Sequence, residues 1–199
     1  MTKKRLKIVH ICSYFQPELG YEEYYTAYFQ SQMGHDVYVI TSDRLFPFKN
    51  IEKMLEQAGE KNTSRIRFKG YRVIDGIKVY RQPVVIETLY DFMLVKGVKK
   101  LLQKIKPDIV QGHGGKEGVP TQGAYYKDKL GYAFVCDSHD FYFDQHVLVR
   151  KTKSWKDVVA KIDYKLFRKR LGSYTYKKAD RVIAVTPDVK DFEIGRAHV

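Results

Sequence analysis

Short apolar runs alternate with stretches of helical periodicity along most of the chain. Runs rich in β-branched and aromatic residues predict strands over residues 6–13, 36–41, 70–74, 77–82, 108–111, 132–136 and 180–186. Apolar residues at three- and four-residue spacing predict helices over residues 22–33, 51–60, 89–105, 121–130 and 154–178. Strands that alternate with helices in this way are typical of a mostly parallel sheet with helices on both faces. The pattern therefore predicts one α/β domain.

Two local patterns refine this prediction. The first predicted helix has an apolar face that we expect to pack on the sheet, formed by Tyr25, Tyr28, Phe29 and Met33. An Asp-Gly pair at residues 75–76 separates two strand-like runs and is typical of a tight hairpin turn. The hairpin interrupts the otherwise regular alternation of strands and helices.

Positive charge is concentrated in the last quarter of the chain. The whole sequence has 36 Lys and Arg against 23 Asp and Glu, a formal net charge of +13. Residues 150–181 alone hold twelve Lys or Arg against three Asp. This excess implies an anionic partner, which could be nucleic acid, phospholipid or a phosphorylated substrate. No RRM, KH or helix-turn-helix pattern is present in the sequence, which argues against nucleic acid.

The predicted helix over residues 154–178 is amphipathic, with apolar residues at helical spacing and Lys and Arg on the remaining faces. We expect the apolar face to pack on the sheet while the basic face is solvated. The alternative is a helix that lies on anionic lipid, with the protein peripheral at the inner face of the plasma membrane.

The cysteines and the hydropathy pattern bear on the compartment. Cys12 and Cys136 lie in apolar strand-like runs, where a free thiol behaves as a small buried hydrophobic group. No apolar run approaches the roughly 20 residues of a membrane-spanning helix, and the amino terminus carries no export signal. We therefore expect a cytoplasmic protein whose membrane contact, if it has one, is peripheral.

Three loops that follow predicted strands carry the candidate chemistry, because parallel sheets bind ligands at the carboxyl ends of their strands. The first, PELGYEE, places Gly20 before a helix amino terminus, where backbone amides can approach a phosphate or sugar; ordinary loop-to-helix geometry is the alternative. The second is a glycine-rich loop entered through His113, which either bonds a ligand hydroxyl or fixes nearby backbone. The third, CDSHD, contains His139, and its carboxylates lack the spacing of a metal motif, so we expect no essential metal.

These loops, in their order along the chain, resemble a known family. The series reads P-E-L-G-Y-E-E, G-H-D-V-Y-V-I-T-S-D, K-P-D-I-V-x-x-H-G, D-S-H and K-K-A-D-R-V-I-A-V-T. It is similar to the amino-terminal domain of the family-4 class of retaining GT-B glycosyltransferases, over residues 7–191. The resemblance implies a Rossmann-like domain. It also implies a hexosyltransferase that moves a sugar from a UDP- or GDP-linked donor to an unknown, sugar or lipid-linked acceptor with retention of configuration.

Residue roles carry over only where the family's motifs match. The family's first loop reads P-x-x-G-G-x-E and borders the donor and acceptor cleft, and this chain matches it at Gly20 and Glu23. Tyr21 replaces the second glycine, which changes how closely the backbone can approach a phosphate. The resemblance also places the loop over residues 44–48, beginning with Arg44, on the acceptor side.

The later loops match in part. His113 and Gly114 match the second half of the family's H-x-H-G, while Gln111 replaces the first histidine, so a role that needs both imidazoles is unsupported. His139 matches the histidine that contacts the donor sugar near the reacting carbon, and Asp140 lies beside it. The resemblance therefore makes His139 the candidate catalytic residue.

The resemblance also predicts the extent of the domain and leaves alternatives. Residues 1–192 are expected to form it, and residues 193–199, EIGRAHV, read as a non-native tail because they back-translate into the start of a common sequencing adapter. The donor-binding carboxyl-terminal domain is then missing, and the fragment alone is expected to be inactive. One alternative is a non-enzymatic Rossmann-like binding module, or a subunit working with a separate donor-binding chain. A nicotinamide-dependent oxidoreductase would need fingerprint glycines that this chain lacks, although Asp43 lies near the expected acidic position.

Overall fold

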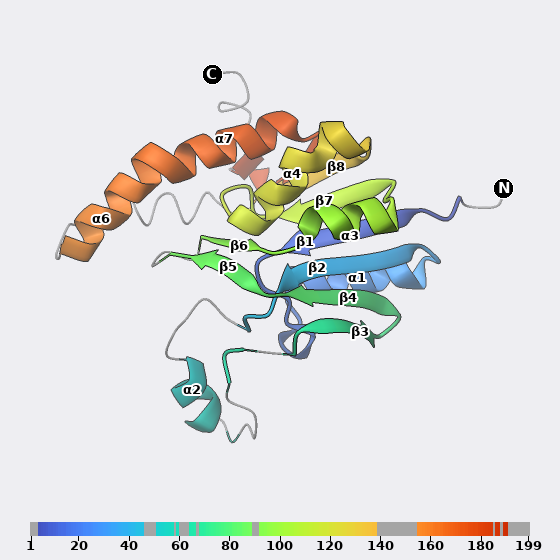
Figure 1. Ribbon diagram of the computed structural model, residues 1–199, viewed down its shortest axis with the longest axis horizontal. Helices are drawn as coiled ribbons and strands as arrows, with labels where there is room; N and C mark the ends of the chain where they lie inside the picture. The colour runs from blue at the N-terminus through green and yellow to red at the C-terminus, as the bar shows by residue number, and fades with distance from the viewer. Residues whose placement is uncertain are drawn as a thin grey trace.

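The described part of the chain folds around one seven-stranded sheet. The computed structural model describes residues 4–45, 51–57, 59, 64–66, 68–88, 92–138, 155–184, 186–187 and 189–190. The strands lie in the order β3 (Gly70–Ile74), β4 (Ile77–Gln82), β2 (Asp36–Ser42), β1 (Lys7–Cys12), β7 (Ile109–His113), β8 (Ala133–Ser138) and β9 (Arg181–Ala184) (Figure 1). These strands confirm the predicted α/β class and its mostly parallel sheet.

Only β3 runs antiparallel within this sheet; the other neighbouring strands are parallel. The turn between β3 and β4 has positive φ at both Asp75 (49°) and Gly76 (81°), as a two-residue hairpin turn requires. The Asp-Gly prediction is therefore confirmed. The first crossover places β2 on one side of β1, and a later crossover places β7 on the other side. The strand order thus reverses between β1 and β7.

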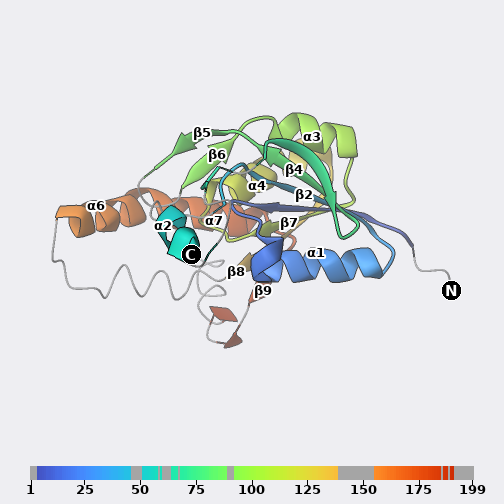
Figure 2. The same cartoon turned by 90° about the horizontal axis from the view of Figure 1, so that it is seen from below.

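Helices cover both faces of the sheet, as predicted. Figure 2 shows α1 (Glu22–Gln32) on one face, with α3 (Val98–Ile105), α4 (Gly118–Leu130) and α7 (Lys169–Lys178) on the other. Two apolar cores follow from this arrangement. One packs Val9, Ile11, Val110 and Phe134 against α3 and α4, and the other packs strand residues from β1, β2 and β4 against Ala27 of α1.

The apolar face predicted for α1 is wrong. Tyr25, Phe29 and Met33 are 49%, 57% and 63% exposed, whereas Ala27 is fully buried. Tyr28 is partly buried against the core, as expected. The helix turns the small Ala27 toward the sheet because a small side chain lets the two backbones approach closely. The larger aromatic side chains are consequently left on the solvent side.

The helix predicted over residues 89–105 is only half correct. Residues 98–105 form α3, but Met93–Val95 form strand β6, which pairs antiparallel with β5 (Val84–Glu87) in a separate two-stranded sheet; residues 89–91 lie outside the described residues. Met93 and Val95 are buried and Leu94 is not, which is the alternation of a strand. Gly97, with φ of 82°, separates strand from helix.

The remaining predicted elements agree with the structure to within a few residues. The predicted second helix is observed as α2 (Ile51–Gln57), and a short η1 turn (Pro17–Leu19) precedes α1. The basic helix is continuous through α6 (Trp155–Asp163), a π-helical segment η2 (Tyr164–Arg168) and α7. Both cysteines are buried and free, as predicted. Among the described helices, none has the length and apolar character needed to cross a membrane.

Candidate functional site

The candidate site lies where the carboxyl ends of β1, β7 and β8 meet. The strand order reverses between β1 and β7, and in open α/β sheets ligands bind at such a switch point. The loop after β1 leads to Gly20, β7 ends at His113, and β8 ends at Ser138, the residue before His139. The fold therefore brings the ends of all three predicted loops to the same edge of the sheet.

A chain of buried polar side chains crosses this switch point. The Asp137 carboxylate lies 2.5 Å from Nδ1 of His113, and Nε2 of His113 lies 2.9 Å from Nδ1 of His10. Nε2 of His10 lies 2.8 Å from the side-chain oxygen of Gln30 on α1. The two imidazole rings are stacked, with 5.2 Å between their centroids. Strands β8, β7 and β1 and helix α1 are thus linked by side chains, in addition to the sheet hydrogen bonds.

The strand register explains why these residues meet. His10 pairs with Gln111 across β1 and β7, and His113 pairs with Asp137 across β7 and β8. Side chains two residues apart in a strand share a face, so Gln111 and His113 both point toward the face that α1 covers. Gln30 also donates from its amide to the Gln111 side-chain oxygen, 3.4 Å away. A glutamine at the family's first histidine position therefore takes part in the same network.

The surroundings shift the pKa values of His10 and His113 in opposite directions. Burial and the adjacent charge of His113 lower the pKa of His10 to about 3. Burial also acts to lower the pKa of His113, but the charge and hydrogen bond of Asp137 outweigh it, with help from Glu23 and Glu22, and the pKa of His113 is raised. The surroundings therefore favour the neutral form of His10 and the protonated form of His113.

The hydrogen-bond partners of the two rings support the same protonation states. With the Gln30 oxygen facing Nε2 of His10, that nitrogen must carry the hydrogen, and a neutral His10 then accepts at Nδ1. His113 must donate from Nε2 to His10 while its Nδ1 faces the Asp137 carboxylate. Both ring nitrogens of His113 are thus engaged, and the ring is 2% exposed. This geometry favours a positioning role for His113 over the direct ligand contact predicted from sequence.

Asp137 also fixes the glycine-rich loop after β7. Its second carboxylate oxygen accepts a hydrogen bond from the backbone N–H of Gly114 at 3.0 Å. Gly114 has φ of 85°, which a side chain rarely adopts, and the glycine lets the chain turn sharply at the strand end. One residue further along β8, the Ser138 hydroxyl is bonded to the Tyr176 hydroxyl of α7 at 3.0 Å. Asp137 and Ser138 are therefore held firmly just before His139; His139 and Asp140 themselves lie outside the described residues.

The first loop borders the same edge. Gly20 ends the η1 turn with φ of 64°, and its N–H donates to the Pro17 carbonyl. Tyr21 precedes α1 and is 52% exposed. Glu23 in the first turn of α1 is close enough to act on the pKa of His113. The structure thus brings Gly20, Tyr21 and Glu23 to the rim predicted for them.

Arg44 is engaged within the protein. Its guanidinium contacts Asp43 at 3.0 Å and Glu87 at 3.2 Å, and Arg65 pairs with the same Glu87 carboxylate. These contacts cross-link the end of β2 to β5 and give Asp43 a structural partner, which argues against the ribose-binding role of the oxidoreductase alternative. The rest of the predicted acceptor-side loop, residues 46–48, lies outside the described residues.

Two members of the polar chain were not predicted from the sequence. His10 lies within an apolar strand and Gln30 within a helix, so neither stood out as a candidate. The signal that could have found His10 is alternation, which puts it on the same strand face as Cys12; its place beside Gln111 follows only from the observed register of β1 and β7. Within the described residues, no group of three or more His, Cys, Asp or Glu side chains is arranged to hold a metal ion.

Comparison with known proteins agrees with the geometry. The model of a family described as Glycosyltransferase Family 4 matches residues 24–195. No curated protein matches the chain. The matched span begins within the first turn of α1, after the Gly20 loop, extends past β9 and includes His113, Asp137 and His139.

Proposed function

Because the chain belongs to glycosyltransferase family 4, we propose that it is the acceptor-side, amino-terminal domain of a two-domain GT-B enzyme. The complete enzyme moves a glycosyl group from a UDP- or GDP-linked sugar to an acceptor, with retention at the anomeric carbon and without an essential metal. The family match across most of the chain is the observation that carries this proposal.

The arrangement at the switch point supports a sugar-binding role for this edge. Ligands of open α/β sheets bind outside the carboxyl ends of the strands, where the strand order reverses. His139 directly follows Ser138 at this point, and the family resemblance gives it contact with the donor sugar near the reacting carbon. In our proposal, Asp137 and His113 act as positioning residues that hold the end of β8 and the Gly114 loop in place.

The chemistry is then divided between two domains. This domain supplies the acceptor surface through the Gly20 loop, including Tyr21 and Glu23, and the segment that begins at Arg44. A second Rossmann-like domain holds the donor diphosphate. Closure of the two orients the acceptor hydroxyl toward the anomeric carbon, which can account for a large part of a rate enhancement. It also surrounds the departing diphosphate with preorganised donors in a site that excludes water.

A donor panel tests the proposed activity. The full-length protein, incubated with UDP- and GDP-sugars, is expected to release nucleotide from one donor class well above the rate without enzyme. Reading the gene beyond Phe192 provides the matching structural test, since a second Rossmann-like domain is expected in the same frame. A stop codon there, together with no nucleotide release from any donor in the panel, would favour the alternative hypothesis: a binding module, or a subunit that works with a separate donor-binding chain.

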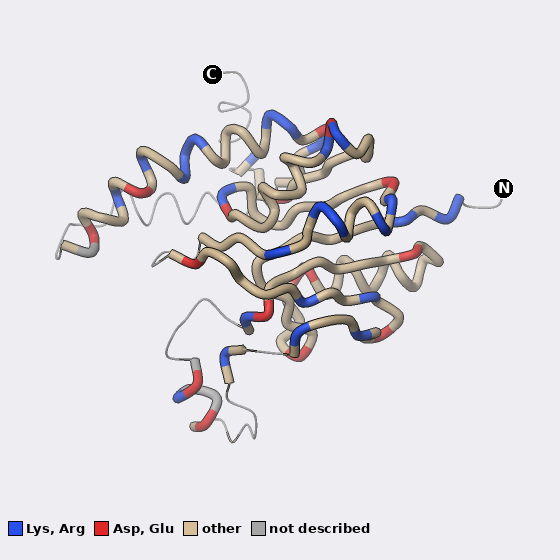
Figure 3. Tube along the Cα trace, viewed as in Figure 1, with Lys and Arg blue, Asp and Glu red and all other residues tan. Residues whose placement is uncertain are grey.

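A second proposal concerns the basic helix. The prediction that its apolar face packs on the sheet is wrong for its first half: Trp155, Val158, Val159, Ile162 and Leu166 are between 38% and 66% exposed. These residues recur at helical spacing and so form one stripe along α6 and into η2. Figure 1 shows α6 extending past the edge of the sheet at which the candidate site lies, and Figure 3 shows Lys and Arg along the same helix.

We propose that this stripe enters the surface of an anionic membrane while neighbouring Lys and Arg meet lipid phosphates. An exposed apolar stripe beside basic residues is the pattern of helices that lie in the membrane interface. Lys165, Lys169 and Arg170 are exposed along this helix, and each basic residue near an anionic surface contributes about 1 kcal/mol to binding. A lipid-linked acceptor in that membrane would then lie at the same edge of the sheet as the candidate site.

Vesicle sedimentation tests the membrane proposal. The protein is expected to bind vesicles that contain phosphatidylglycerol, to bind them more weakly at high salt, and not to bind vesicles of pure phosphatidylcholine. Replacing Ile162 and Leu166 together by Ser should weaken binding by at least about tenfold, since burial of each side chain stabilises by about 1.5 kcal/mol or more. Val73→Ser, at an equally exposed position on β3, is the control and should bind as the unmodified protein does. Equal binding by both variants would contradict the proposal.

A further inference from the structure

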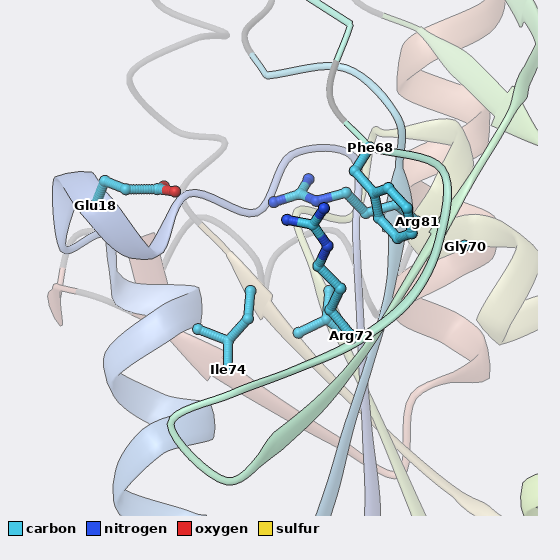
Figure 4. A pocket seen from close by; sticks show the side chains of 7 residues that line it. Glu18, Phe68, Gly70, Arg72, Ile74 and Arg81 are labelled. Atoms are coloured by element: carbon cyan, nitrogen blue, oxygen red, sulfur yellow. The ribbon is translucent and has the colours of Figure 1, made fainter. Parts of the chain in front are cut away.

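A small cavity lies beside the candidate site, between the η1 turn and the β3–β4 hairpin (Figure 4). Its volume is about 200 Å³. Glu18 of η1 forms one wall, and Arg72 of β3 and Arg81 of β4 form the opposite wall. Because η1 follows β1 and Arg81 is the penultimate residue of β4, the cavity opens at the edge of the sheet that carries Gly20.

The antiparallel register brings the two arginines to one face of the hairpin. Gly70 pairs with Arg81, and Arg72 pairs with Val79. Residues two apart in a strand share a face, so both guanidinium groups project into the same space, as Figure 4 shows. Gly70, opposite Arg81, has no side chain to fill that space. The hairpin therefore presents two cationic groups side by side.

Both arginines are held in place by other contacts. Arg81 is 8% exposed, and its Nη2 donates to the Phe15 carbonyl at 2.7 Å, which ties it to the end of β1. The Arg72 guanidinium lies over the Phe68 ring, 4.0 Å from the ring centroid. A planar guanidinium that is already oriented loses less freedom when it binds a ligand. Arg81 is thus oriented before a ligand arrives, and the exposed Arg72 is steadied by the Phe68 ring.

The charges in the cavity indicate the class of ligand. Two guanidinium groups face one carboxylate, that of Glu18, which points across the cavity toward them (Figure 4). Fixed arginine forks match the planar oxygen pairs of carboxylates and phosphates and bind them through two parallel hydrogen bonds. Ligand pockets for drug-sized molecules measure roughly 300–1,000 Å³. A cavity of about 200 Å³ therefore suits one anionic group of a larger molecule better than a whole nucleotide.

We propose that Arg72 and Arg81 bind an oxyanion, a phosphate or a carboxylate, carried by the acceptor. The assignment to the acceptor rests on the glycosyltransferase function proposed above, whereas the oxyanion site itself does not. The site selects acceptors that carry a negative charge. Glu18 weakens the binding of such a charge by repulsion.

Titration of small anions tests the site without any donor. We expect inorganic phosphate, glucose 1-phosphate or glucuronate to shift the backbone amide signals of Gly70 and Arg72 saturably in ¹H–¹⁵N spectra at constant ionic strength. Whichever of phosphate and carboxylate binds tighter identifies the group on the acceptor. Arg72→Gln should weaken anion binding about tenfold or more. Arg72→Lys keeps the charge but loses the guanidinium fork, so its affinity should lie between those of the unmodified chain and of Arg72→Gln. Glu18→Gln should strengthen binding severalfold.

Arg181→Gln is the matched control, because Arg181 is an exposed arginine on β9, at the opposite edge of the same sheet. It should bind each anion as the unmodified chain does. Saturable binding lost with Arg72 and gained with Glu18→Gln supports the site. Absence of binding by all three anions, or equal weakening in the Arg72 and Arg181 variants, would overturn it. Because the titration contains no nucleotide sugar, such a failure leaves the donor panel to decide the proposed function.

Discussion

Replacement of His113 by Leu is expected to lower the free energy of unfolding by about 3–5 kcal/mol. His113 is buried and its ring lies between the Asp137 carboxylate and His10. Removing it takes the adjacent imidazole away from the carboxylate of Asp137, which is itself fully buried. A buried charge without compensation is among the most destabilising changes a single substitution makes. Chemical denaturation followed by circular dichroism measures the loss.

A second substitution separates the lost charge pair from a simple cavity. Asp137→Asn keeps an oxygen that can accept from Gly114 but removes the negative charge. We expect the double variant His113→Leu, Asp137→Asn to be more stable than His113→Leu alone, because the uncompensated charge is gone. His35→Leu is the control; His35 is only half-buried and accepts one long bond from the Leu6 N–H, so its loss should cost about 1 kcal/mol. A double variant less stable than His113→Leu would contradict the charge-pair account.

The same pair predicts how stability changes with pH. The pKa of His113 is raised by Asp137 against the effect of burial, so its contribution is complete below its ordinary pKa and is lost as the pH rises through the raised value. Burial and the charge of His113 lower the pKa of His10 to about 3, so between pH 6.5 and 3 the unfolded chain binds a proton at His10 and the folded chain does not. Stability therefore falls as the pH drops from about 6.5 toward 3, and this network is most stabilising near pH 6.5.

Replacement of His139 by Ala is expected to reduce kcat/KM of the full-length enzyme by about 100-fold or more. The reason is its proposed contact with the donor sugar near the reacting carbon, where lost stabilisation acts directly on the transition state. Folding should be unaffected in the described core, since the two residues before it are fixed by other partners: Asp137 by His113 and Gly114, and Ser138 by Tyr176.

The matched control for His139 is His35→Ala. His35 lies just before β2, at the amino end of a strand and so at the edge of the sheet away from the site. Turnover by this variant should equal that of the unmodified enzyme. If His139→Ala turns over the donor as fast as His35→Ala does, the catalytic assignment of His139 is wrong.

The sequence was sufficient for the layout of the fold and for bringing the three candidate loops to one edge of the sheet. Alternating strand and helix patterns located the parallel strands, and their carboxyl ends pointed to the loops at Gly20, His113 and His139. The pattern was insufficient where tertiary packing decides. Tyr25 and Phe29 have the spacing of a core face, yet α1 approaches the sheet through Ala27. Strand β6 is only three residues long, and its apolar residues continue a helical pattern that Gly97 interrupts.

Pairing between distant strands explains what was missed at the site. His10 and Asp137 gain significance only once β1 and β8 are known to flank β7, because the register then places them on either side of His113. The arginine cavity depends in the same way on the pairing of Gly70 with Arg81 across the hairpin. Turn chemistry predicted the hairpin, but which face of it would meet η1 depends on the position of β4 beside β2.

Following the transfer reaction of the full-length protein by ¹H NMR at the anomeric proton tests the proposed donor class and the retention of configuration together. We expect the signals of one nucleotide sugar to disappear while the transferred sugar appears with the anomeric configuration of the donor. Inverted product, or no consumption of any UDP- or GDP-sugar in the presence of candidate acceptors, would contradict the proposal.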